Sequence, residues 1–275
     1  MTIEKKNDGI ILKDVNCLDI EISVFCGQAF RWKKNEKGFL VGTVKGKTAV
    51  IEKTEEGYFF HSCSEEEFRE IWYDYFDLDT DYAEICEKIS PDESIKKAVE
   101  MYYGIRILKQ EPWEALCSFI ISQNNNIPRI TGIIDRLCSM YGEKNEKGEY
   151  SFPSYERLKG LTVEDLAPLR AGFRSKYILD AAEKLCNKEL DLQKIYSITI
   201  DEGRNELMKI KGVGPKVAEC TLLYGFSKKE AFPIDVWVKR ILSELYPKGL
   251  PECIKGSEGI AQQYLFHWRR NLKEE

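Results

Sequence analysis

The sequence contains only two histidines, and none of its nine cysteines forms a C-x-x-C pair. Imidazoles and clustered thiolates are the usual protein ligands of zinc and iron–sulfur clusters. We therefore expect no metal site and no cluster. The cysteines are scattered through mostly apolar segments, which predicts reduced thiols in a reducing compartment.

Long uninterrupted apolar runs are also missing, and the N-terminus, MTIEKKNDGI, lacks the apolar centre of a signal peptide. We therefore expect a cytoplasmic protein without membrane contact. The net charge of −5 argues against a protein that is basic over its whole surface, but the charges are unevenly distributed. Acidic residues concentrate between 64 and 82. Basic residues gather between 204 and 240, at Arg204, Lys209, Lys211, Lys216, Lys228, Lys229, Lys239 and Arg240.

The remaining composition, with 43% apolar residues, allows a substantial core. Alternating β-rich runs between residues 28 and 62 predict an antiparallel meander, and Ser64 with Glu67 predicts a capping box that starts a helix. After about residue 92 the pattern is helical throughout. We predict an α+β protein with a small N-terminal antiparallel β-sheet domain (1–92), followed by a mostly α-helical, two-lobed body (93–275).

A helix–turn–helix pattern stands out between residues 204 and 224. Lys211, Gly212, Val213 and Gly214 interrupt the helical periodicity, and Pro215 suits the first position of a second helix. Backbone amides that crowd together at such a turn, next to the positive end of a helix, bind phosphate or another anion. This hairpin is predicted to contact DNA.

Two residues in and after this hairpin can carry chemistry. Lys216 lies in the first turn of the second helix, where an unprotonated amine would be a nucleophile. Asp235 follows 19 residues later in P-x-D and opens the next helix. The alternative interpretation is a lysine that only binds phosphate and an aspartate that only caps a helix.

The hairpin, the lysine and the aspartate together resemble the signature of helix–hairpin–helix base-excision DNA glycosylases. Residues 122–129, SQNNNIPR, further resemble the NNNIxRI loop of the 8-oxoguanine DNA glycosylase/AP lyase family. The resemblance implies a bifunctional enzyme in which Lys216 forms a Schiff base, assisted by Asp235. It implies no cofactor and a double-stranded DNA partner that contains 8-oxoguanine. We expect a monomer associated with the nucleoid.

The resemblance also implies roles for residues that contact the DNA around the lesion. Asn124 would fill the space left by the extruded base, and Arg129 would contact the orphaned cytosine. Phe173 would be the wedge and Arg174 a second arginine on the cytosine. Without the resemblance, the asparagines would be read as an ordinary connection between helices and Phe173 as part of the core.

A pocket for the damaged base is implied by three further segments. CGQAFRW resembles a family segment in which a glycine carbonyl, here that of Gly27, faces the lesion. N7 of guanine accepts hydrogen bonds, whereas N7 of 8-oxoguanine carries a hydrogen, so a carbonyl there favours the lesion. Cys220 and Phe266 would sandwich the base, and Gln262 would read its Watson–Crick edge, although Gln263 is adjacent.

Three positions depart from the eukaryotic members of the family and resemble its bacterial members. Phe173 replaces the usual tyrosine, Trp237 stands in place of a histidine, and Arg269 in place of an aspartate. Two alternatives remain: a glycosylase for another damaged base, either an alkylpurine or an oxidised pyrimidine, and a non-catalytic hairpin protein that only binds DNA. The nucleophilic lysine disfavours the monofunctional alkylpurine type.

Overall fold

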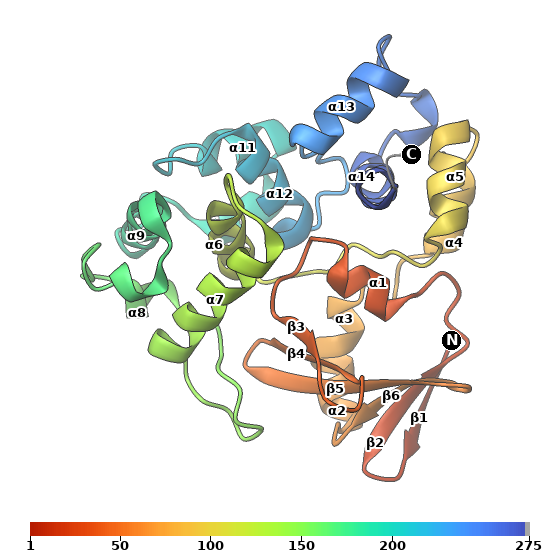
Figure 1. Cartoon of the computed structure of the whole chain (residues 1–275), viewed down its shortest axis with the longest axis horizontal. Helices are drawn as coiled ribbons and strands as arrows, with labels where there is room; N and C mark the ends of the chain where they lie inside the picture. The colour runs from red at the N-terminus through yellow and green to blue at the C-terminus, as the bar shows by residue number, and fades with distance from the viewer. Residues whose placement is uncertain (273–275) are drawn as a thin grey trace. The chain divides into compact units, whose positions relative to one another are not determined.

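The helices and strands lie within residues 1–272, the part of the chain that this computed structural model describes (Figure 1). Their contacts divide the chain into two units. The first consists of residues 1–42, 48–109 and 234–275, and the second of residues 43–47 and 110–233. This division differs from the expected boundary at residue 92.

Apart from residues 43–47, the first unit contains an antiparallel sheet, which confirms the predicted fold class. Its six strands run in the order β1-β2-β6-β5-β4-β3. They are β1 (Thr2–Lys6), β2 (Gly9–Lys13), β3 (Trp32–Lys34), β4 (Leu40–Val44), β5 (Lys47–Thr54) and β6 (Gly57–His61). The first hairpin, β1–β2, was not predicted. It adds Ile10 opposite Phe60 and so extends the buried face of the sheet.

A short helical segment follows the sheet, as α2 (Glu65–Glu67), the π-helical turn η1 (Phe68–Trp72) and α3 (Tyr73–Tyr75). Ser64 caps it, because its hydroxyl accepts from the Glu67 amide at 3.1 Å. Only half of the predicted capping box is used for capping, since the Glu67 carboxylate accepts instead from Trp72 Nε1 at 3.1 Å. The rings of Phe68 and Trp72 are fully buried.

The first unit is completed by helices from both ends of the chain. These are α1 (Ile20–Phe25), α4 (Tyr82–Ile89), α5 (Glu93–Met101), α13 (Val236–Leu245), η4 (Glu252–Ile254) and α14 (Glu258–Asn271). α14 packs on α5 and α13. The hydroxyl of Tyr246, just past α13, donates to Asp92, the N-cap of α5, at 2.7 Å. These contacts explain why the last helices belong with the sheet.

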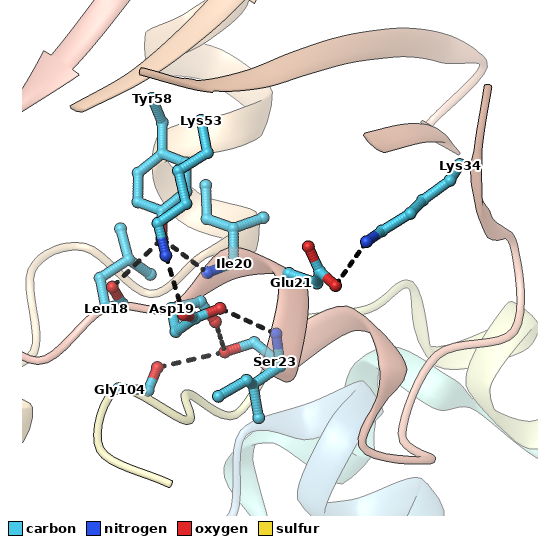
Figure 2. Close-up of polar contacts among 10 residues, drawn as sticks. Leu18, Asp19, Ile20, Glu21, Ser23, Lys34, Lys53, Tyr58 and Gly104 are labelled. Atoms are coloured by element: carbon cyan, nitrogen blue, oxygen red, sulfur yellow. Dashed lines mark hydrogen bonds and ion pairs between the residues drawn. The ribbon is translucent and has the colours of Figure 1, made fainter. Parts of the chain in front are cut away.

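Helix α1 is fastened to the sheet at its N-terminus (Figure 2). Asp19 caps the helix, and Lys53 of β5 lies 3.2 Å from its second carboxylate oxygen. The Tyr58 hydroxyl of β6 accepts from the Ile20 amide at 3.3 Å and donates to the Leu18 carbonyl at 3.4 Å. Burial, and then the nearby Asp19 carboxylate, raise the pKa of Tyr58, so the phenol keeps its donor hydrogen. The N-terminus of α1 is therefore held against the sheet, and its C-terminus is followed by Cys26 and Gly27.

The second unit is helical. It comprises α6 (Pro112–Ser122), α7 (Ile127–Tyr141), α8 (Tyr155–Leu158), η2 (Ala167–Leu169), η3 (Gly172–Arg174), α9 (Ser175–Cys186), α10 (Leu192–Ser197), α11 (Ile200–Leu207) and α12 (Pro215–Phe226). α6 and α12 form its centre, and both are apolar on nearly every face, as expected for buried helices. Within residues 1–272 no helix is long and apolar enough to cross a membrane.

Candidate active site

The predicted hairpin is formed by α11 and α12, with a tight turn between them. Gly212 has a φ of 79°, and a Cβ there would lie 2.3 Å from the ring of Tyr177. The amide of Lys211 donates to Asp180 Oδ2 at 2.7 Å, and that of Val213 donates to the Ile210 carbonyl at 3.0 Å. The Val213 side chain is buried. Residues 211–214 form the turn that was expected to bind an anion. The amides of Lys211 and Val213 donate within the protein, which leaves the amides of Gly212 and Gly214 as the candidates for binding a phosphate.

The half-buried Lys216 lies in the first turn of α12, and its amine has two defined contacts within the second unit. Its Nζ donates to Ser122 Oγ at 3.2 Å and lies 5.0 Å from the centroid of the Phe119 ring. The Phe119 ring is in turn stacked on Tyr224, with centroids 5.1 Å apart. Cys220 lies one turn further along α12 and is 3% exposed. The amine is thus held at the end of α6, next to the asparagine loop.

A buried carboxylate on α12 was not singled out from the sequence. Glu219 is 7% exposed, and its two oxygens accept from Arg204 Nε of α11 at 2.5 Å and from the Phe232 amide at 2.8 Å. It therefore ties the two hairpin helices to the backbone that leads into P-x-D. A lone glutamate in an otherwise apolar helix is the sequence signal that indicates such a role, because buried charges require partners.

The three asparagines of the loop between α6 and α7 (residues 123–126, the asparagine loop) make different contacts. Asn125 Nδ2 donates to the Ile121 carbonyl at 3.0 Å, and Asn126 caps α7 by accepting from the Arg129 amide at 3.0 Å. Asn124 adopts a left-handed backbone conformation with φ 46°, and it is exposed. The resemblance assigned the DNA-filling role to Asn124, and its side chain is the one not used to build the loop in these ways.

The arginine and aromatic pair after η2 lies against the same loop. Arg174 is 2% exposed and donates to the carbonyls of Gln123, Asn124 and Ala171. Burial, and then the charge of Arg129, lower the pKa of Arg174. Phe173 is 46% exposed, with the Arg174 guanidinium 4.4 Å from its ring centroid. A large apolar ring left open to solvent beside the asparagine loop suits a wedge.

Around Gly27, in the first unit, the chain makes a bend that is held from several sides. Gly27 has a φ of 94°, a conformation that glycine adopts readily. Gln28 is fully buried, and its Nε2 donates to the Ser23 carbonyl at 2.9 Å and to the Arg106 carbonyl at 2.7 Å. Burial raises the pKa of the neighbouring Cys26 thiol to about 12, so the thiol stays protonated and donates to the Ser23 carbonyl at 3.2 Å.

The remaining predicted residues of the first unit lie at the N-terminus of α13 and on α14. Asp235 caps α13, because its Oδ1 accepts from the Val238 amide at 2.8 Å, and the residue is half-buried. On α14, Gln262 is 5% exposed and Phe266 is half-buried. The departure at Arg269 has a local partner, since its Nη2 lies 2.9 Å from Glu244 Oε2 of α13.

The predicted residues therefore fall into two groups. The second unit brings Lys216 and Cys220 together on one helix and gathers Asn124, Arg129, Phe173 and Arg174 around one loop. The first unit carries Gly27, Asp235, Gln262 and Phe266. Glu219, which fixes the backbone before P-x-D, and Gln28, which fixes the bend at Gly27, were not assigned roles from the sequence.

Two family models match consecutive parts of the chain. The model described as the N-terminal domain of 8-oxoguanine DNA glycosylase matches residues 10–116. The model of the HhH-GPD superfamily of base excision DNA repair proteins matches residues 117–249. A probable N-glycosylase/DNA lyase of Methanothermobacter thermautotrophicus is 31% identical over 71% of this chain and 73% of its own length. The chain belongs to the 8-oxoguanine DNA glycosylase family.

Other members of this family extend the similarity to nearly the whole chain. The 8-oxoguanine glycosylase/lyase of Clostridium acetobutylicum, solved with double-stranded DNA containing cytosine opposite 8-oxoguanine, has a TM-score of 0.91. It is 39% identical, and the match covers 98% of both chains. The N-glycosylase/DNA lyase of Saccharomyces cerevisiae is 34% identical over 80% of this chain but only 66% of its own length. The predicted enzyme class, a DNA glycosylase with lyase activity, is confirmed.

Proposed function

We propose that this protein, acting as a monomer, excises 8-oxoguanine paired with cytosine in double-stranded DNA and then cleaves the abasic site. Lys216 is the nucleophile and Asp235 its partner. The observation that carries the proposal is the placement of Lys216 in the first turn of α12, with Nζ on Ser122 and above the Phe119 ring. An amine that only binds phosphate at the hairpin surface has no need of such a platform.

The chemistry requires two bonds to change at C1′ of the damaged nucleotide. The neutral Lys216 amine attacks C1′, and the bond from C1′ to the base nitrogen breaks, so the base departs with the bonding electrons and takes up a proton. Asp235 supports the positive charge that develops on the sugar, because a fixed carboxylate stabilises charge that forms next to it. As a helix cap, Asp235 commits Oδ1 to the Val238 amide and is held in one orientation.

Strand cleavage follows from the covalent intermediate. Opening of the sugar gives a Schiff base between Lys216 Nζ and C1′, and this iminium makes the C2′ proton acidic. Loss of that proton expels the 3′ phosphate by β-elimination, which breaks the C3′–O bond. No other residue of the chain has to form a covalent bond with the DNA in this sequence of steps.

Recognition of the lesion and of its partner base belongs to the other residues. The Gly27 carbonyl accepts from N7–H of 8-oxoguanine and repels N7 of guanine. Cys220 and Phe266 stack on the base, and Gln262 contacts its Watson–Crick edge. Asn124 and Arg129 occupy the duplex around the orphaned cytosine, and the Phe173 ring keeps the stack open. The buried Arg174, which the resemblance implied for the cytosine, instead fixes their loop through the carbonyls of Gln123 and Asn124. Gly212 and Gly214 hold a phosphate, with Lys211 adding charge.

Borohydride trapping on a duplex with one 8-oxoguanine:cytosine pair tests the mechanism. Reduction of the Schiff base leaves a covalent protein–DNA adduct, which we expect for the wild type and not for Lys216→Gln. Lys194→Gln makes the same chemical change at an exposed position of α10 and should still form the adduct. Base release without any adduct would show a monofunctional glycosylase. An adduct only with an alkylpurine substrate or an oxidised pyrimidine substrate would support the alternative specificity. Binding without base release would support the non-catalytic alternative.

A further inference from the structure

The second of the two adjacent glutamines on α14 contacts the bend that contains Gly27. Gln263 is 1% exposed, and its Nε2 donates to the Cys26 carbonyl at 3.1 Å. A backbone carbonyl can only accept a hydrogen bond, so the amide nitrogen, and not the amide oxygen, must face it. The contact joins the last helix of the chain to the peptide that enters Gly27, 237 residues earlier.

Gln28, which follows Gly27, is held by hydrogen bonds, as is Cys26, which precedes it. The Gln28 amide nitrogen donates to the Ser23 and Arg106 carbonyls, and its Oε1 accepts from the Leu108 amide at 2.9 Å. The Gln28 side chain is therefore anchored at both ends of its amide group. One neighbour of Gly27 is held through its carbonyl by Gln263, and the other through its side chain.

Gly27 itself supplies little resistance to rotation. Its φ of 94° lies in a region that other residues rarely adopt. Because glycine lacks a Cβ, the two peptides that flank it can rotate at low energetic cost. The direction of its carbonyl is set by what holds Cys26 on one side and Gln28 on the other. Loss of the Gln263 donor releases the Cys26 carbonyl, while the hydrogen bonds of the Cys26 thiol and of the Gln28 side chain stay in place.

We propose that Gln263 is a positioning residue for lesion discrimination, which fixes the Cys26 carbonyl and thereby aims the Gly27 carbonyl at N7–H of 8-oxoguanine. The inference rests on the proposed function, because it assumes that Gly27 faces the damaged base. It gives the neighbouring glutamines different tasks. Gln262 is assigned to the edge of the base, and Gln263 to the backbone that tells 8-oxoguanine from guanine.

Loss of the Gln263 donor should impair recognition of the lesion but not cleavage of an abasic site. A carbonyl that is aimed away from N7 loses both its attraction to the N7 hydrogen of 8-oxoguanine and its repulsion of the lone pair of guanine. Cleavage of an abasic site that already exists involves Lys216 and the sugar but no base, so it does not depend on the Gly27 carbonyl. A defect in positioning and a general defect in folding therefore give different patterns of activity.

The test compares Gln263→Met, which keeps the length of the side chain and removes its donor, with the wild type. Three quantities are measured: the single-turnover excision rate on an 8-oxoguanine:cytosine duplex, the ratio of binding to that duplex and to a guanine:cytosine duplex, and the cleavage rate of a preformed abasic-site duplex. Loss of one buried hydrogen bond predicts a fall of about tenfold in excision rate and binding ratio. Abasic-site cleavage should stay within about twofold of the wild type.

Gln193→Met is the matched control, because it makes the same change on the exposed side of α10. Equal loss of excision and abasic-site cleavage would overturn the proposal in favour of a merely structural role, and unchanged excision and binding ratio would overturn it outright. If Gln263→Met does not fold, Gln263→Leu provides the same comparison, since it is also apolar and has no donor. A wild-type protein that binds both duplexes equally would refute the proposed function itself, and the inference with it.

Discussion

The Glu219 carboxylate offers a quantitative test of how the hairpin is coupled to the P-x-D segment. Both of its oxygens accept hydrogen bonds from charged or backbone donors, namely Arg204 Nε and the Phe232 amide. Glu219→Gln keeps the shape of the side chain but leaves only one oxygen to accept. One of the two donors must therefore face an NH₂ group and lose its partner.

The expected loss of stability can be bounded from the contacts. Breaking a fully buried ion pair costs about 3–5 kcal/mol, and a hydrogen bond to a charged group contributes about 1.5–3 kcal/mol. The Arg204 side chain is 30% exposed and also pairs with Asp201, so solvent and that carboxylate offset part of the loss. We expect about 2 kcal/mol, which lowers Tm by roughly 3–4 °C for a chain of this size.

Activity should fall as well, because Phe232 lies only three residues before Asp235. Three residues reach about 10 Å at most, so release of the Phe232 amide gives the aspartate new freedom. We expect the single-turnover excision rate to fall about tenfold, which corresponds to about 1.4 kcal/mol in the activation barrier.

Asp201→Asn is the matched control, since it removes a second carboxylate from the same arginine. Asp201 is 77% exposed, and an exposed pair of this kind contributes no more than about 1 kcal/mol. Thermal denaturation would measure the change in stability of both variants, and single-turnover kinetics would measure the change in their excision rates. The reasoning fails if Glu219→Gln melts and reacts like the wild type, or if Asp201→Asn has an equal effect.

Three further predictions concern other residues. Asn124→Ala should leave Tm unchanged and slow excision at least about tenfold. Asn125→Ala should instead lower stability by about 1 kcal/mol, because it removes the hydrogen bond to the Ile121 carbonyl. Thermal denaturation and single-turnover kinetics on both variants would show whether the two asparagines have separate roles. Phe173→Ala should weaken binding to a lesion duplex without loss of stability, because the ring is 46% exposed, and titration of the duplex would detect it. Burial, and then Arg270, lower the pKa of His267 from 6.5 to about 4, so its contribution to stability is complete above pH 6.5 and is lost as the pH falls toward 4. Because the ring is only partly buried, we expect roughly 1 kcal/mol between pH 7.5 and 5.5, and a His267→Phe variant whose unfolding free energy changes as much as that of the wild type over this range would contradict it.

The sequence predicted those parts of the site that local chemistry determines. Pro215 marks the start of α12, and Asp235 caps the next helix, because both preferences depend on the few residues around each position. The antiparallel sheet and the helical second half follow from periodicity in the same way. The first hairpin was missed, although an Asn7–Asp8 turn and the apolar strand β2 mark it.

The parts that were not predicted depend on contacts between distant residues. Arg174 was assigned to cytosine, but its burial comes from the carbonyls of Gln123 and Asn124, about 50 residues earlier in the chain. Gln262 was assigned to the base by resemblance alone, and no role was predicted for the adjacent Gln263, because the rotation of α14 about its axis is set by packing and not by its own sequence. The same applies to Glu219, whose partners lie on a preceding helix and on a following loop.

The division of the chain has a consequence for biosynthesis. The second unit ends at residue 233, whereas the first is completed only by residues 234–275. On the ribosome, the helical unit can therefore assemble while the β-sheet still lacks α14, whose Tyr264 is fully buried. A premature stop in the final segment would release a protein with an intact Lys216 helix and an open hydrophobic core, which exposes it to proteases and aggregation.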